Sequence, residues 1–272
     1  MDARGALVVC PTPIGNLADV TLRLLDELRG ADLAACEDTR HSRVLLERHG
    51  IRLPLVSLHE HNEAVRVPEL LGRIEAGETV CLLSDAGMPT VSDPGTLLVR
   101  GAIERGLEVR VLPGPSAVPT ALAASGLGGG GFVFAGFLPR KPGQLGALLD
   151  RLDTTGLPVV AFESPRRLPA TLRAVAERDG TRPLAVCREL TKLHEQIARG
   201  SAAELAARFS EPPRGEITLV LGAVEAARED AVDVAALREL GDAVGAKRAA
   251  ALAAALTGEP RNRLYRLLVG DE

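Results

Sequence analysis

Four short segments rich in glycine, proline and small polar residues are the clearest candidates for a ligand site. They are PTPIGNLAD at 11–19, SDAGMPTVSDPG at 84–95, PGPSA at 113–117 and FESPRR at 162–167. Glycine lets the backbone approach a ligand closely, and proline makes a loop rigid. Each segment follows an apolar run, and ligands of open parallel sheets bind outside the carboxyl ends of the strands. The segments therefore predict a pocket for a flat, polar ligand of moderate size, with plain turns as the alternative.

A second group of candidates is charged. The run EDTRH at 37–41 follows the second apolar run of the chain. Carboxylates beside arginine stay ionised through pairing, which suits a cleft, yet the same run is also typical of a capped helix N-terminus. Further titratable side chains at expected loop or strand ends are Glu60, His61, Glu163 and Lys192. Structural ion pairs explain these residues as well as catalysis does.

Several common sites are excluded by spacing. Gly126-x-Gly128-x-x-Gly131 matches the dinucleotide-binding pattern, but a helical stretch precedes it and an apolar strand follows, the reverse of the required order. The chain has no Walker A, GxSxG or HExxH motif. His59-Glu60-His61 lacks a third ligand at a motif spacing, so we predict no metal site. The four cysteines form no CxxC pair and lie in apolar runs, so we expect reduced core thiols.

Short apolar runs alternate with helix-like stretches, and these elements must position the candidates. Strands are expected at 6–10, 32–37, 54–58, 79–84, 108–112, 132–137, 159–163, 184–190 and 216–222. Helices are expected at 19–29, 41–49, 63–76, 96–105, from Ser116, and at 143–152, 166–178 and 201–208. The alternation predicts an α/β fold with mostly parallel sheets. We expect two consecutive α/β domains, at 1–115 and 116–223, and a helical appendage at 233–272.

Composition narrows the class of protein. The chain has 272 residues, of which 46% are hydrophobic and 25% charged, as in ordinary globular proteins. No apolar run is long enough to span a membrane, and the N-terminus does not look like a signal peptide, so we expect a cytoplasmic protein without membrane contact. The net charge of −4 excludes a basic field over the whole molecule. With five Phe, one Tyr and no Trp, an aromatic-rich stacking platform for single-stranded RNA is not expected.

Nine ordered motifs carry a resemblance that runs from about residue 6 to the C-terminus. Among them are CEDTRHSRVLL (36–46), LLSDAGMPTVSDPG (82–95), FAGFLPRK (134–141), FESPRRL (162–168) and RGEITLVL (214–221). The chain closely resembles the bacterial 16S rRNA (cytidine-2′-O)-methyltransferases of the tetrapyrrole methylase superfamily. The resemblance implies two α/β domains of the tetrapyrrole methylase type and a short helical C-terminal piece. It also implies S-adenosylmethionine (SAM) in the cleft between the domains, and a homodimer.

The same resemblance implies an activity and a cofactor site. The activity is methylation of the ribose 2′-hydroxyl of a cytidine in the decoding region of 16S rRNA, within the 30S subunit. The superfamily's small-molecule enzymes carry Gly-Asp-Pro where this chain reads Ser84-Asp85-Ala86, a form that is normal for the rRNA branch. Asp85 is therefore kept as a ligand contact, with a turn aspartate as the alternative. Carried over by motif, the cofactor-binding residues are Pro13, Gly15, Asp85, Ala86, Gly87, Met88, Ser116, Ala117 and Phe162.

A ribose hydroxyl is weakly acidic, so a base or a nearby cation should assist the transfer. Among the charged candidates we assign Arg40 and Lys192 as cations near the RNA or the developing oxyanion, and Glu37 as base or orienting group. Arginine binds phosphate bidentately, which makes local basic clusters candidates for RNA contact. These are Arg140, Lys141, Arg166, Arg167, Arg261 and Arg263. Two alternatives remain open: a tetrapyrrole methylase acting on a small molecule, and a ribosome-assembly factor with an inactive SAM pocket.

Overall fold

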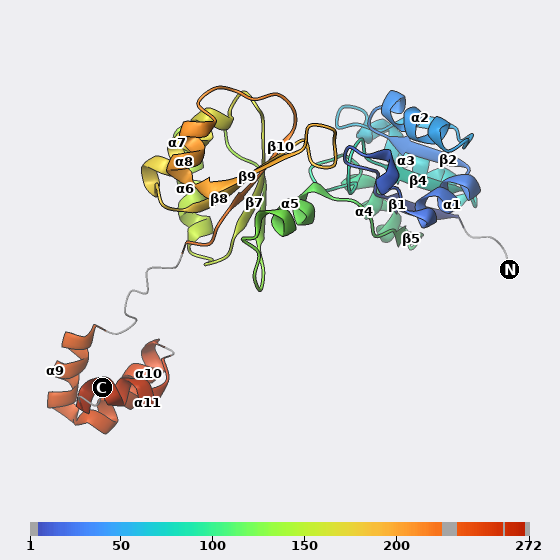
Figure 1. The fold of residues 1–272 in the computed structure, drawn as a ribbon. Coiled ribbons are helices and arrows are strands. Elements are labelled where there is room, and N and C mark those ends of the chain that lie inside the picture. Colours follow the sequence, from blue (N-terminus) through green and yellow to red (C-terminus); the bar gives the residue numbers. More distant parts are fainter. Residues whose placement is uncertain (1–4, 225–232, 258, 270–272) are drawn as a thin grey trace. The chain divides into compact units, whose positions relative to one another are not determined.

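The computed structural model describes residues 5–224, 233–257 and 259–269. The chain divides into two compact units, one of Met1–Leu149 with Leu157–Ala223 and one of Asp150–Gly156 with Val224–Glu272. The first unit contains both β-sheets, and the second contains the three C-terminal helices (Figure 1). The domain boundary expected at 115/116 lies inside the first unit and stays a prediction. Residues 1–4, 258 and 270–272 of the expected domains lie outside the described residues.

The first sheet is entirely parallel and has the strand order β3-β2-β4-β1-β5. Its most buried strands are continuous apolar runs, as expected for strands covered on both faces. Because the strands are parallel, the loops after β1, β4 and β5 meet at one edge of the sheet. The strands are β1 (Ala6–Cys10), β2 (Leu33–Cys36), β3 (Leu55–Ser57), β4 (Thr79–Leu83) and β5 (Glu108–Val111).

Helices cover both faces of this sheet (Figure 1). On one face α1 (Leu22–Gly30) and α2 (Thr39–Arg48) bury leucines against alternate strand residues. On the other face α3 (Glu63–Glu75) and α4 (Thr96–Glu104) do the same. The helix expected from residue 19 begins later, because a short 3-10 turn, η1 (Leu17–Asp19), precedes Thr21, whose side chain caps α1.

The second sheet is mixed, with the order β6-β7-β10-β8-β9, and only β6 and β7 run parallel. The expectation of mostly parallel sheets therefore holds for the first sheet and is wrong for the second. One strand, QIARGS, was not expected because its polar sequence lacks an apolar run. It lies at the sheet edge, where polar residues are normal. The strands are β6 (Val133–Phe137), β7 (Val159–Glu163), β8 (Pro183–Arg188), β9 (Gln196–Ser201) and β10 (Ile217–Leu221).

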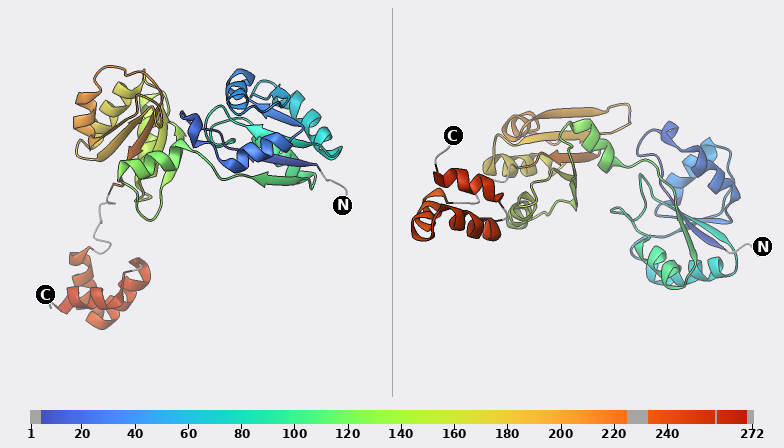
Figure 2. Two further views of the ribbon diagram at one scale, coloured as in Figure 1. Left: turned by 45° about the vertical axis from the view of Figure 1, so that its right-hand side comes forward. Right: turned by 90° about the horizontal axis from the view of Figure 1, so that it is seen from below.

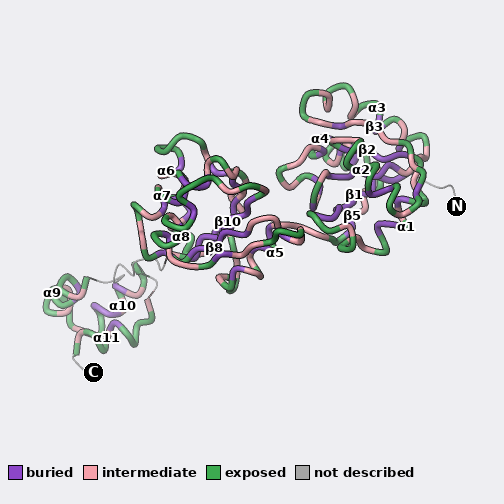
Figure 3. Tube along the Cα trace, turned by 45° about the horizontal axis from the view of Figure 1, so that its top comes forward, coloured by how far each residue is buried: buried purple, intermediate pink, exposed green. Residues whose placement is uncertain are grey.

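The second sheet is also covered on both faces. Helix α5 (Ala117–Ser125) packs against β10 and β8 and shares an apolar core with Ile14 of the first half. Helices α6 (Pro142–Asp153), α7 (Leu168–Arg178) and α8 (Ala202–Arg208) lie together on the opposite side (Figures 1 and 2). Figure 3 shows that burial follows the strands, while the outer faces of the helices are exposed.

The second unit is a three-helix bundle with a small core. Helices α9 (Val234–Val244), α10 (Ala246–Thr257) and α11 (Arg261–Val269) bury Leu237, Ala250, Ala253 and Leu264. Helix α9 ends before Gly245, whose φ is 84°. None of the described helices is long and apolar enough to span a membrane.

The loop at 84–95 has an unusual backbone. Gly87, Thr90, Ser92 and Gly95 all have positive φ, at 85°, 70°, 67° and 111°. For a β-branched residue such as Thr90 this conformation is rare. Gly95 is fixed on two sides, because its N–H donates to Glu63 Oε1 at 2.9 Å and a Cβ there would lie 2.6 Å from Leu82 Cδ2. Packing against the sheet core therefore determines the shape of this loop.

We expect Gly95→Ala to lower the free energy of unfolding by about 2–4 kcal/mol, because it adds left-handed strain to a clash with the buried Leu82. Gly50→Ala is the matched control, since Gly50 also has a positive φ (63°) but no atom within 4 Å of its Cβ position. Its expected cost is about 1 kcal/mol, from strain alone. Thermal and urea unfolding followed by circular dichroism measures both; equal losses would contradict the packing argument.

Candidate active site

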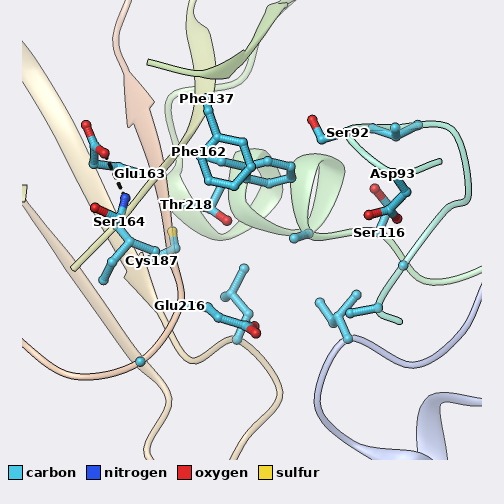
Figure 4. Close-up of a pocket in the computed structure, with 18 of the residues that line it drawn as sticks. Ser92, Asp93, Ser116, Phe137, Phe162, Glu163, Ser164, Cys187, Glu216 and Thr218 are labelled. Carbon is cyan, nitrogen blue, oxygen red and sulfur yellow. Dashed lines mark hydrogen bonds between the residues drawn. The ribbon is translucent and has the colours of Figure 1, made fainter. Parts of the chain in front are cut away.

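A pocket of about 380 Å³ lies where loops of the first sheet face strands of the second. Figure 4 shows Asp93 and Ser116 on one side of it and Phe137, Phe162 and Thr218 on the other. The walls also include Ile14, Met88, Leu190 and Ile217. Its volume and its mixture of apolar walls and few polar groups are typical of small-molecule sites. The four predicted ligand loops therefore contribute to one pocket, through Ile14, 86–93, 116–117 and 162–165.

Most of the predicted cofactor residues line this pocket. Ala86, Gly87, Met88, Ser116, Ala117 and Phe162 do so, whereas Pro13, Gly15 and Asp85 do not. Pro13 is buried. Gly15 is a close-packing position, because a Cβ there would lie 2.4 Å from Lys192 Cγ.

Asp85 does not line the pocket, but its carboxylate connects the pocket loop at 84–95 to the start of α2. Its Oδ1 accepts the Asp38 N–H at 3.0 Å, and its Oδ2 lies 3.1 Å from His41 Nδ1. The start of α2 and the 84–95 loop are thereby held together. Asp85 thus makes a contact between loops, and the ligand contact expected of it stays a prediction.

Backbone hydrogen bonds hold the loops at 11–19 and 84–95 close together at this wall of the pocket. Thr12 and Gly87 exchange two backbone hydrogen bonds, of 2.9 and 3.0 Å, and Thr12 Oγ1 donates to Ser84 O at 3.0 Å. The positive φ of Gly87 would strain any other residue, and a Cβ there would lie 3.3 Å from Ile14 Cγ2. The two loops therefore present peptide backbone to the pocket.

None of the three predicted catalytic residues lines the pocket. The Arg40 side chain is 86% exposed, and its Nε donates to both carboxylate oxygens of Asp38, at 3.0 and 3.1 Å. Lys192 Nζ lies 2.9 Å from both Glu189 Oε1 and Glu216 Oε2. Glu37 is exposed; desolvation, then Asp85 and Glu60, raise its pKa. These residues were predicted because of their charge and their positions in the motifs. In the structure, both cations, Arg40 and Lys192, are paired with neighbouring carboxylates.

Asp93 is the functional candidate that sequence reasoning missed. It lines the pocket and faces the phenylalanine wall (Figure 4). No hydrogen-bond or ion-pair partner stands beside its carboxylate in the described part of the chain. Burial, with the nearby carboxylates of Glu37 and Asp85, raises its pKa to about 7. One sequence feature could have pointed to Asp93. It is the second aspartate of SDAGMPTVSDPG, a segment that was expected to bind a ligand.

A buried carboxylate anchors the opposite wall. Glu163 is 2% exposed and accepts hydrogen bonds from Thr171 Oγ1 at 2.6 Å and Ser164 N at 2.7 Å. Arg167 Nη2 lies 3.2 Å from Glu163 Oε2 and also donates to the carbonyls of Leu138 and Pro139. Arg167, expected to contact RNA, is therefore held within the fold by Glu163 and by two carbonyl groups.

The other basic candidates are more available. Arg140, Lys141, Arg166 and Arg261 are exposed, and the described residues provide no ion-pair partner for them. Arg263 is paired with Glu259 at 2.7 Å.

Among described residues, no three His, Cys, Asp or Glu side chains are grouped to hold a metal ion. All four cysteines are buried free thiols, and burial raises the pKa of Cys187, which lines the pocket, to about 11. Cys187 is therefore unsuited to nucleophilic chemistry.

The sequence matches the Tetrapyrrole (Corrin/Porphyrin) Methylases over residues 6–206 and the RsmI C-terminal HTH domain over residues 226–270. A Mesorhizobium japonicum protein named Ribosomal RNA small subunit methyltransferase I is 46% identical, over 97% of this chain and 91% of its own. The Escherichia coli O157:H7 protein of the same name is 40% identical, over 97% and 95%. The chain belongs to the ribosomal RNA small subunit methyltransferase I family of tetrapyrrole methylases.

Solved structures similar to this family member share its fold. A uroporphyrin-III C-methyltransferase from Thermus thermophilus, solved with S-adenosylhomocysteine, is 20% identical with a TM-score of 0.57, over 80% of this chain and 97% of that one. A diphthine synthase is 13% identical with a TM-score of 0.60, over 80% and 90%. These similarities confirm the expected α/β tetrapyrrole methylase architecture. The profile match at 226–270 covers the three helices that this methyltransferase family member carries after its second sheet.

We expect Asp93→Asn to stabilise the protein at pH 8. The folded-state pKa of Asp93, about 7, lies above its ordinary value of 3.8. The folded protein therefore binds more protons between these values, and this residue's contribution to stability falls as the pH rises from 4 to 7. The uncharged amide removes the cost of holding an ionised carboxylate in this buried position. The variant's thermal midpoint should therefore exceed the wild-type value at pH 8 and match it near pH 4. Calorimetry at both pH values measures this; a lower midpoint at pH 8 would contradict it. Asp19→Asn, which removes an exposed carboxylate outside the pocket, is the control.

Proposed function

We propose that this protein transfers the methyl group of SAM to the ribose 2′-hydroxyl of a cytidine in the decoding region of 16S rRNA. The observation that carries this proposal is nearly full-length similarity to ribosomal RNA small subunit methyltransferases I, at 40–46% identity. The pocket supports it, because six residues expected to bind the cofactor line one cavity.

The residues present fit SAM. The cofactor has an apolar methylene chain, a flat base and polar ends, and the pocket combines apolar walls with hydroxyl groups and backbone. Close backbone at Gly87, with Ala86 and Met88, would hold one side of the cofactor, while Ser116, Ala117 and Phe162 would hold other parts. When bound, SAM supplies a methyl group that its positively charged sulfur activates toward nucleophiles.

Asp93 is the group we propose as proton acceptor, in place of Glu37. The Asp93 carboxylate would accept the proton of the ribose 2′-hydroxyl when that oxygen takes the methyl group that bound SAM would supply. A base with a pKa near neutrality removes such a proton efficiently without being protonated in most molecules at pH 8. Asp93 has the pocket position and the unpaired carboxylate that this role needs. Arg40, 86% exposed and paired only with Asp38, suits an RNA phosphate contact better than an oxyanion contact.

The RNA contact surface follows from the available cations. Arg140, Lys141 and Arg166 follow or precede elements of the second sheet, and Arg261 lies on α11 of the helical unit, where Arg263 is paired with Glu259. We propose that both units bind rRNA, within the 30S subunit, and that the protein acts as a homodimer. The proposed substrate, 16S rRNA, is part of the bacterial ribosome. We therefore also propose a cytoplasmic location.

The deciding experiment is methylation of 30S subunits and of free 16S rRNA by the purified protein with labelled SAM. Mapping of the alkali-resistant position then locates the modified ribose. Label in one 2′-O-methylcytidine supports the proposal. Methylation of uroporphyrinogen without methylation of rRNA would favour a small-molecule enzyme. SAM binding without turnover on either substrate would favour an assembly factor.

We expect kcat/KM to rise with pH through about 7 and to level off above it, since the free enzyme needs the Asp93 carboxylate ionised. Asp93→Asn should lower kcat/KM by at least about 100-fold, because a general base typically contributes about 100- to 10,000-fold. The variant should also lose the rise near pH 7. A wild-type rate, or an unchanged pH profile, in Asp93→Asn would remove Asp93 from the mechanism; Glu104→Gln, which removes an exposed carboxylate on α4, serves as control.

Salt dependence tests the basic pair beside the second sheet. Arg140→Gln combined with Lys141→Gln should reduce the slope of log affinity for 30S subunits against log salt by about 1 per lost phosphate contact. SAM affinity should not change, because neither residue lines the pocket. Arg105→Gln removes an exposed arginine that is paired with Glu75 on the first sheet's helices, and it should leave the slope unchanged. Filter binding at several salt concentrations measures the slopes. Equal slopes for the wild type and the double variant would exclude this pair from the RNA surface.

A further inference from the structure

Three of the chain's five phenylalanines form a ring cluster, and two of them, Phe137 and Phe162, line the pocket. The rings of Phe134 and Phe162 have centroids 5.1 Å apart, and those of Phe137 and Phe162 are 5.4 Å apart. Phe137 lines the pocket yet is 61% exposed. A large exposed aromatic side chain inside a concave site is costly in water and is characteristic of a surface that a flat ligand covers.

A β-bulge in β6 creates this wall. Phe134 pairs with Val160 and Phe137 with Phe162, so three steps along β6 correspond to two along β7. In a regular strand, residues three apart face opposite sides of the sheet. The bulge, with Gly136 at a φ of 64°, brings Phe134 and Phe137 to the same side, where both contact Phe162.

The same bulge brings β6 close to the loop that carries the proposed proton acceptor. A Cβ on Gly136 would lie 4.0 Å from Ser92 Oγ, and Ser92 directly precedes Asp93. Ser92 itself has a positive φ of 67°, so its side of this approach has strained backbone. Such strain concentrates at functional sites, where it re-aims side chains. The Phe137 ring and Asp93 therefore line opposite walls of the same pocket (Figure 4).

We propose that Phe137 is the surface on which the base of the target nucleotide stacks when its ribose reaches the pocket. This inference rests on the proposed function. Enzymes that modify a nucleotide within folded nucleic acid commonly extrude it and hold its base against aromatic side chains. Stacking on an aromatic ring depends little on which base is stacked. Phe137 therefore positions the base, and other contacts distinguish cytosine from the other bases.

Charge favours a nucleotide of RNA over the adenine of SAM as the occupant. Three and four residues beyond Phe137 the chain reaches Arg140 and Lys141, which are exposed and have no ion-pair partner among the described residues. Phe137 ends the edge strand of its sheet, which leaves its ring 61% exposed. Phe162 on the inner strand β7 is more covered and was assigned to the cofactor. An exposed ring followed within four residues by two cations without a described ion-pair partner suits the base and phosphates of a polynucleotide.

The test compares Phe137→Leu, which keeps apolar bulk but removes the ring, with Phe137→Tyr, which keeps the ring. Phe132→Leu is the matched control, since Phe132 is 40% exposed, precedes the same strand and does not line the pocket. Full-length proteins are assayed for 30S affinity in the presence of S-adenosylhomocysteine, for SAM affinity by calorimetry, and for methyl transfer to 30S subunits. Thermal midpoints verify folding.

Phe137→Leu should weaken 30S affinity by about 5- to 150-fold, the effect expected from the loss of one stacked base. Its SAM affinity should stay within about twofold of wild type, because a cofactor contact is not what the ring provides. Phe137→Tyr and Phe132→Leu should bind 30S subunits like wild type. Unchanged 30S affinity in Phe137→Leu, with an active wild-type protein, overturns the stacking role alone. An equal loss of SAM affinity overturns it in favour of a cofactor wall. A wild-type protein that methylates neither 30S subunits nor rRNA overturns both proposals.

Discussion

The close approach of backbone at Gly87 is the constraint on which the site depends. Two hydrogen bonds between Thr12 and Gly87 join the loops after β1 and β4, and Ile14 then extends into the apolar core of the second sheet. The loop at 84–95 can take this course only because glycine tolerates positive φ at its ends and the fold supports Thr90 and Ser92 in the same region. Without that pairing the first sheet would have no shared wall with the second.

The charges around the site follow two different rules. Arg40, Lys192 and Arg167 each have carboxylate or carbonyl partners, so their charges are compensated where they stand. Asp93 has none among the described residues, and it lies near the carboxylates of Glu37 and Asp85. Such an arrangement costs folding stability, and proteins retain costly groups mainly where activity requires them. Pairing thus separates the structural charges of this site from Asp93, the carboxylate that we propose as proton acceptor.

Sequence patterns predicted the first sheet well because buried parallel strands are continuous apolar runs, as ALVVC and TVCLL illustrate. They failed for β9, whose polar residues suit an edge and carry no periodic signal, and for strand direction in the second sheet, which depends on pairing across long loops. Loop composition located the pocket correctly. Composition alone could not identify Asp93 or Phe137, since the first depends on what surrounds a carboxylate and the second on a one-residue bulge at Gly136.

The strand order of the second sheet has a consequence for synthesis of the chain. Its central strand, β10, is the last to leave the ribosome, yet it separates β7 from β8, which do not pair with each other. Until residues 217–221 emerge, two hydrophobic strands have open edges that invite association with other chains. The first sheet is complete by residue 111 and needs no later strand. Translation therefore divides folding into an early, self-sufficient half and a late half that closes in a single step.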